Sequence, residues 1–137
     1  MYLVDTNVVS ETRRARPHGG VMAWLRDAGD RNLHLSAVTI AELQMGVEVT
    51  RQHDSVKAAE IERWIEEIGR TWNILPMDAA TFRVWAKLMH VRSDTLPSDA
   101  MMAATAIQHQ LTIVTRNIRD FVSFDVKLFN PFIDARR

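Results

Sequence analysis

The sequence predicts an α/β fold: one three-layer α/β/α domain built around a parallel sheet of four to five strands. Short apolar runs alternate with segments of helical periodicity along the chain, which is the pattern of strand–helix–strand units. The apolar runs lack polar alternation, so both faces of the sheet should be covered by helices. The length of 137 residues suits one domain, predicted to span 1–133, with a basic tail at 134–137.

The first half of the chain supplies two predicted strands and three predicted helices. Each strand is a short apolar run, and the helices are marked by capping residues or by apolar positions at helical spacing. Either Ser36 or Thr39 is placed to cap the second helix, and Gly69 is the expected stop of the third. The predicted elements are strands at 2–5 and 33–35, and helices at 21–28, from 36 or 39 to about 49, and at 54–69.

The second half continues the same alternation. Asp78 is an expected helix cap, and Pro97 suits the first turn of the following helix, where a missing N–H costs nothing. A polar loop at 115–120 follows the most apolar strand of this half. The predicted elements are strands at 74–75, 111–114 and 126–129, and helices at 78–93 and from 97 to about 110.

Composition excludes several classes of protein. The chain has no cysteine, so disulfides and thiolate metal sites are excluded, as suits a cytoplasmic protein. No run of apolar residues is long enough to cross a membrane, and the N-terminus lacks the pattern of a signal peptide. Seventeen basic and seventeen acidic residues balance, so any attraction for nucleic acid must come from local basic clusters.

Four carboxylates are the main candidates for chemistry: Asp5, Glu42, Asp99 and Asp120. Each has an ordinary alternative role. Asp5 could cap a helix that starts at Thr6, Asp99 could favour the dipole of its helix, and Glu42 and Asp120 could be exposed acids. However, ligands of an open parallel sheet bind beyond the carboxyl ends of the strands. Asp5 and Asp120 follow two such strands, so these acids are expected to gather there.

A gathering of carboxylates raises their pKa values, and the usual remedy is a hard divalent cation. Mg²⁺ and Mn²⁺ prefer oxygen ligands of this kind. Competing chemistries lack their motifs, because the chain contains neither GxGxxG nor GxxxxGK[ST], and its five histidines form no HExxH pattern. The sequence therefore predicts a magnesium or manganese site that includes Asp5.

Four segments of the chain, in order and spacing, resemble the PIN-domain family, and in particular its VapC-type and FitB-like toxins. The segments are MYLVDTNVVSE, LSAVTIAELQMGV, LPSDAMMAATAIQH and LTIVTRNIRDF, and the ending VKLFNPF is also similar to the FitB-like branch. The resemblance covers nearly the whole chain. It implies a Mg²⁺- or Mn²⁺-dependent ribonuclease that serves as the toxin of a type II toxin–antitoxin pair.

The resemblance also implies roles for individual residues. The family's catalytic acids match Asp5, Glu42 and Asp99, with Asp5 and Asp99 holding the metal most directly. The fourth acidic position falls on Asn117 or on Asp120, which follows it by three residues. Supporting roles fall on Thr6, Asn7 and Thr115, whose polar groups would orient the acids or water.

Basic residues at the rim are expected to attract the RNA, because an acidic site repels phosphate until a metal is bound. The candidates are Arg116, Arg119 and the cluster at 13–16. The expected partners are an RNA substrate, a cognate antitoxin, and DNA only through that antitoxin. A homodimer is expected through the helices at 54–69 and 78–93. The alternative function is a PIN-like binding module that acts through its antitoxin in operator autoregulation.

Overall fold

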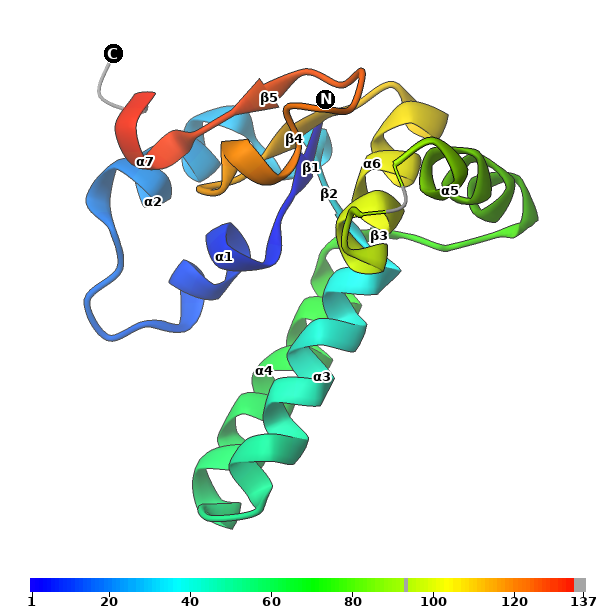
Figure 1. Ribbon diagram of the computed structural model, residues 1–137. Coiled ribbons are helices and arrows are strands. Elements are labelled where there is room, and N and C mark those ends of the chain that lie inside the picture. The colour runs from blue at the N-terminus through cyan, green and yellow to red at the C-terminus, as the bar shows by residue number, and fades with distance from the viewer. Residues whose placement is uncertain (93, 135–137) are drawn as a thin grey trace.

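The computed structural model describes residues 1–92 and 94–134 and contains a five-stranded sheet (Figure 1). All neighbouring strands are parallel, and their order is β3-β2-β1-β4-β5. The strands are β1 (Tyr2–Val4), β2 (Leu33–Ser36), β3 (Asn73–Leu75), β4 (Thr112–Val114) and β5 (Leu128–Phe129). The predicted fold class is therefore confirmed. The central strand is the first of the chain, and it pairs with β2 on one side and β4 on the other.

The helices connect these strands and cover both faces of the sheet. They are α1 (Thr6–Val9), α2 (Gly19–Ala28), α3 (Ala37–Arg51), α4 (Ser55–Thr71), α5 (Ala79–Val91), α6 (Pro97–His109) and α7 (Pro131–Asp134), with 3₁₀ turns η1 (Ser10–Arg13), η2 (Asp30–Asn32) and η3 (Ile118–Asp120). Helices α3 and α4 form an antiparallel pair that projects beyond the sheet (Figure 1). No helix among the described residues combines the length and the apolar character needed to cross a bilayer.

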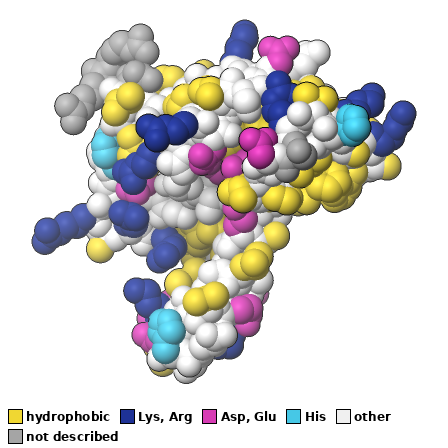
Figure 2. Space-filling view, in the orientation of Figure 1, with side chains coloured by type: hydrophobic (Ala, Val, Ile, Leu, Met, Phe, Trp, Pro, Cys, Tyr) yellow, Lys and Arg dark blue, Asp and Glu magenta, His cyan; other side chains and the backbone are white. Residues whose placement is uncertain are grey.

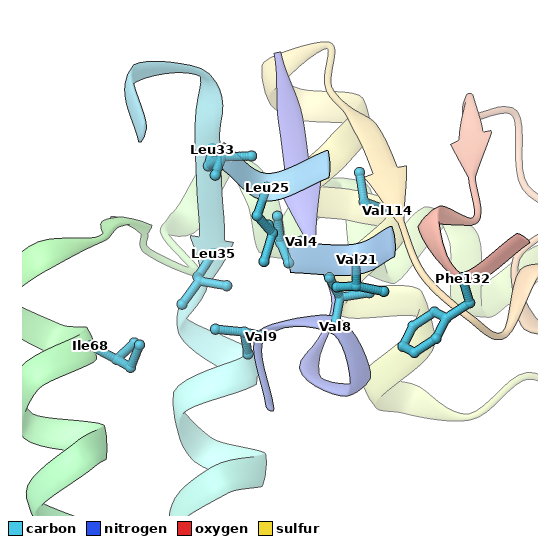
Figure 3. Packing of buried hydrophobic residues seen from close by; sticks show 10 residues of the cluster. All are labelled: Val4, Val8, Val9, Val21, Leu25, Leu33, Leu35, Ile68, Val114 and Phe132. Carbon is cyan, nitrogen blue, oxygen red and sulfur yellow. The ribbon is translucent and has the colours of Figure 1, made fainter. Parts of the chain in front are cut away.

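Two apolar cores explain the layers, because successive side chains of a strand point to opposite faces. Val4 and Val114 pack on one face against residues of α1, α2, α4 and α7, as Figure 3 shows. Leu3 and Ile113 pack on the other face against α6, with α5 outside it. The alternation within β1 and β4 thus fixes which helices lie on which side, and the strand ends stay open for polar residues.

Several predicted boundaries need correction. Ser36, not Thr39, caps α3: its hydroxyl accepts from the backbone N–H of Val38, whereas Thr39 is buried inside the helix. Gly69 does not stop α4, which continues to Thr71, because the helical hydrogen bonding runs past it as far as the bond from the Trp72 N–H to the Ile68 backbone oxygen. Strand β5 is shorter than predicted and begins at Leu128.

The C-terminal prediction is only partly covered. Asp134 is the last residue of α7, so the predicted basic tail does not begin there. Residues 135–137, which make up the rest of that tail, lie outside the described residues.

Candidate metal-binding active site

The candidate acids come from four separate elements that meet beyond the carboxyl ends of the central strands. Asp5 directly follows β1, and Asp120 closes η3, the turn after β4. Asp99 lies in the first turn of α6, and Glu42 lies in the second turn of α3, the helix after β2. In Figure 2 acidic side chains gather near the middle of the visible face, with Lys and Arg side chains on either side.

Asp5 is held from three directions. One carboxylate oxygen accepts from the backbone N–H of Thr6 at 2.8 Å, so Asp5 does cap α1. The other oxygen accepts from the Thr115 hydroxyl at 2.8 Å and from the Asn7 amide at 3.3 Å. Burial raises the pKa of Asp5, while the hydrogen bonds from Thr115 and Thr6 oppose the rise. The sequence presented helix capping and a place in the acidic cluster as alternative roles for Asp5. In the structure Asp5 has both roles.

Thr115 and Asn7 join the ends of the two central strands. The Thr115 hydroxyl, which donates to Asp5, also accepts from the backbone N–H of Asn117 at 3.0 Å. The side-chain oxygen of Asn7 accepts from the backbone N–H of Arg116 at 3.1 Å. These bonds fix the start of the loop after β4 relative to Asp5, and thereby set where the rest of that loop lies.

Glu42 is oriented by Thr6, whose hydroxyl donates to the Glu42 carboxylate at 2.7 Å. The side chain of Glu42 is exposed, yet the surrounding protein partly desolvates it. This desolvation raises the pKa of Glu42, the hydrogen bond from Thr6 lowers it, and the negative charge of Asp5 raises it further. Glu42 therefore shares the electrostatic environment of Asp5 although the two come from different elements.

Asp99 shows the clearest effect of crowding. Its pKa is raised to about 6, first by desolvation and then by the negative charges of Asp120, Asp5 and Glu42, in that order. Its place near the N-terminus of α6 favours a negative charge, but the other influences outweigh this one. Asp99 does not cap α6, because Leu96 occupies that position.

Asp120, not Asn117, is the fourth carboxylate that acts on the others. Its charge contributes to the raised pKa values of both Asp5 and Asp99. Asn117 contributes its backbone N–H to Thr115, and its side chain forms no hydrogen bond with the described residues. Between the two alternatives that the sequence leaves open, the electrostatic influence on Asp5 and Asp99 makes Asp120 the better candidate.

The donor set fits a hard divalent cation. It consists of carboxylate oxygens, and none of the four acids forms a salt bridge with a Lys, Arg or His in 1–92 or 94–134. Among the described residues, no three His, Asp or Glu side chains lie close enough together to coordinate one metal ion directly. Coordination that includes water molecules suits this spacing, and Mg²⁺ usually retains several of its waters.

Comparison with known proteins identifies the family. The sequence profile of the PIN domain matches residues 2–127. The chain belongs to the PIN-domain family. It is 36% identical to "Toxin FitB" of Neisseria gonorrhoeae, over 98% of this chain and 100% of that protein. It is 32% identical to "VapC ribonuclease Y4jK" of Sinorhizobium fredii, with the same two coverages.

Solved structures agree with the fold of this PIN domain. The crystal structure of FitAcB from Neisseria gonorrhoeae superposes with a TM-score of 0.85 at 34% identity, covering 97% of this chain and 99% of the other. A structure of FitAB bound to an IR36 DNA fragment gives 0.83 at 33% identity, covering 96% of each chain. The resemblance inferred from the four sequence segments is confirmed.

The expected basic rim of the PIN domain divides into two groups. Arg116 and Arg119 lie in the loop that carries Asp120, and both are exposed. In the cluster at 13–16, Arg14 pairs with the buried Glu11 at 3.3 Å, and Arg13 lies over the Trp64 ring. The loop arginines are therefore the better placed to meet a substrate.

Sequence reasoning missed Asn130 and Phe132, which contact the loop after β4 from the C-terminal segment. The Asn130 amide donates to the backbone oxygen of Arg116 at 3.3 Å, and the Phe132 ring lies under the Arg116 guanidinium. The ending VKLFNPF contains both residues and was noted only for its resemblance. A polar residue directly after a parallel strand, at the same sheet edge as Asp5, is the signal that could have pointed to Asn130.

The raised pKa of Asp99 predicts a pH dependence of stability in the metal-free PIN domain. The folded-state pKa of about 6 exceeds the reference value of 3.8, so the folded state favours the protonated form. The associated stabilisation is full below the reference value and is lost as the pH rises through about 6. Without metal, the melting temperature of the wild type should therefore fall relative to Asp99→Asn across this window. Parallel curves for the two proteins would contradict the assignment.

Proposed function

We propose that this chain is a divalent-metal-dependent endoribonuclease and the toxin component of a type II toxin–antitoxin system. The observation that carries the proposal is the carboxylate cluster at the sheet edge of a PIN domain, which has no cationic partner among the described residues. Burial and neighbouring negative charge raise the pKa values of Asp5, Glu42 and Asp99. Relatives named as a toxin and as a ribonuclease, similar over almost the whole chain, support the same activity.

Asp5 and Asp99 are the residues that would hold Mg²⁺ or Mn²⁺, with Glu42 and Asp120 acting through water or a second ion. When bound, the ion supplies an activated water and stabilises negative charge on the attacked phosphate. The chain's own contribution is orientation. Thr115 fixes the Asp5 carboxylate and Thr6 fixes that of Glu42. Such fixed geometry keeps the acids from turning away when the substrate arrives.

The test is cleavage of single-stranded RNA by the purified protein, with Mg²⁺ or Mn²⁺ and with EDTA. Metal-dependent loss of full-length RNA that EDTA stops is expected. The alternative function is a binding module that acts through an antitoxin in operator autoregulation. If it is correct, the RNA should not be cleaved under either condition. A solved relative is a FitAB complex bound to DNA, so contact with DNA is proposed here only through the antitoxin.

The antitoxin is expected to inhibit by presenting an Arg or Lys to the acidic site. A carboxylate cluster without a cation partner is a receptor for a guanidinium, which can bind two oxygens at once. Replacing the inhibitory Arg or Lys of the antitoxin by Ala should restore cleavage in the complex, as gel assays of RNA would show. Inhibition by a segment that contains no basic residue would contradict this part of the proposal.

A homodimer is also expected, although the structure changes its basis. The four tryptophans are half-buried within a single chain, so they do not supply the predicted apolar excess. Helix α5 and the segment after it still expose Phe82, Val91 and Leu96. Exposed apolar residues of this kind mark interfaces. Light scattering at micromolar concentration should report twice the mass of one chain, and Val91→Asp should shift it toward the monomer.

A further inference from the structure

A hollow of about 850 Å³ lies beside the carboxylate cluster. Two segments form it: the loop after β4, and the chain from β5 into α7. Asp120 is part of its wall, so the hollow borders the candidate active site directly. Its other walls include Arg116, Asn117, Ile118, Arg119 and Ile133.

Arg116 is fixed at this hollow at three points. Its backbone N–H donates to Asn7, and its backbone oxygen accepts from Asn130. Its guanidinium lies 3.8 Å from the centre of the Phe132 ring, and Phe132 is itself anchored in the core at 7% exposure. A planar cation held in this way loses little freedom on binding a ligand, and its fork of donors matches a phosphate.

The rest of the hollow has the chemistry of a nucleotide site. Arg116 and Arg119 form no salt bridge with any residue in 1–92 or 94–133. Val122 and Ile133 expose 62% and 69% of their surface and offer an apolar wall. The Asn117 amide, which forms no hydrogen bond with described side chains or backbone, can meet the polar edge of a base. The volume also lies within the usual range for a small-ligand pocket.

We propose that this hollow binds one unpaired nucleotide of the RNA strand, next to the bond that is cleaved. Arg116 holds its phosphate, and the base lies against the apolar wall. This inference rests on the proposed function, because the neighbouring acids must act on the same strand. An unpaired nucleotide is required, because proteins read RNA bases mainly where these are unstacked and turned outward.

Binding can be measured apart from cleavage by fluorescence anisotropy with an unstructured, labelled RNA in the Asp99→Asn background. Arg116→Ala should weaken binding by about tenfold, as expected for loss of one charge-assisted contact. It should also reduce the salt dependence of log Kd by about 0.7, the value for one phosphate of a single strand. Arg31→Ala, at an exposed arginine of η2 before β2, is the matched control and should change neither quantity.

The position of the base is tested by replacing each nucleotide of that RNA in turn with an abasic one. One position should lose affinity by several-fold, and Val122→Trp, which fills the hollow from an exposed site, should remove that difference. Val56→Trp, at an equally exposed valine on α4, should retain it. Arg116→Lys keeps the positive charge but lacks the planar guanidinium that lies over the Phe132 ring, so it should bind the RNA more weakly than the wild type and more tightly than Arg116→Ala.

The possible outcomes separate the two proposals. The nucleotide site would be overturned if no abasic replacement weakened RNA binding, or if Arg116→Ala and Arg31→Ala bound the RNA equally well. Metal-dependent cleavage by the wild type would be unaffected by either result. If Arg116→Ala bound RNA as tightly as the wild type but no longer bound the antitoxin, the nucleotide site would also be overturned. The hollow would then be assigned to a segment of the antitoxin. Absence of metal-dependent cleavage by the wild type would instead remove the proposed function.

Discussion

Replacing Asp99 by Asn should abolish RNA cleavage and leave the metal-free fold at least as stable as the wild type. The amide is neutral and binds a hard cation poorly, so activity should be lost. Stability should not fall, because the pKa of Asp99 at about 6 shows that its surroundings disfavour the charge at neutral pH.

The measurement is a set of melting curves in EDTA and in Mg²⁺ or Mn²⁺, paired with cleavage assays. The variant should melt at an equal or higher temperature in EDTA and should gain much less from metal than the wild type. Asp27→Asn, at an exposed acid in the last turn of α2, is the control and should retain cleavage and the metal response. If Asp99→Asn melts well below the wild type in EDTA, the carboxylate has a structural role and its assignment to the cluster is wrong.

Phe121→Ala should produce the largest loss of stability, about 3–5 kcal/mol, which is typical of truncating a buried aromatic residue. Phe121 is 1% exposed and packs in the second core beside Phe124 and residues of α6. It directly follows Asp120, so it also fixes the end of the catalytic loop. Cleavage by the fraction that remains folded should therefore fall as well.

Urea unfolding curves and activity at low temperature would separate these two effects. Val56→Ala is the matched control, because the Val56 side chain on α4 is exposed and lies outside both the core and the candidate site. It should change the free energy of unfolding by less than about 0.5 kcal/mol, as is usual for surface positions. Comparable destabilisation by both variants would show that Phe121 does not anchor the loop.

The sequence predicted the layers and strand positions because the physical signals are local. Buried parallel strands are uniformly apolar, and Asp78 caps the helix that it precedes, as predicted. Boundaries were less certain where backbone energies nearly balance, as at Gly69, where a helix could end or continue. The short helices α1 and α7 have too few residues for any periodicity to be visible.

The candidate site was predictable in part for the same reason. Asp5 and Asp120 could be placed because strand ends are recognisable, and the choice between Asn117 and Asp120 needed the three-dimensional arrangement. The contact of Arg116 with Phe132 could not be anticipated, because it depends on how a short C-terminal helix folds back against the loop after β4. Long-range packing of this kind leaves no periodic trace along the chain.

The pairing of β1 with β4 has a consequence for synthesis of the protein. The hydrogen bond between Thr115 and Asp5 joins residues 110 positions apart, and the β1–β4 ladder spans a similar separation. Contacts this distant close late and slow folding. A growing chain therefore carries Asp5 and Glu42 long before Asp99 and Asp120 have been made, and its acids cannot assemble while the ribosome still holds the last strands. The carboxylate cluster can therefore form only when translation is almost complete.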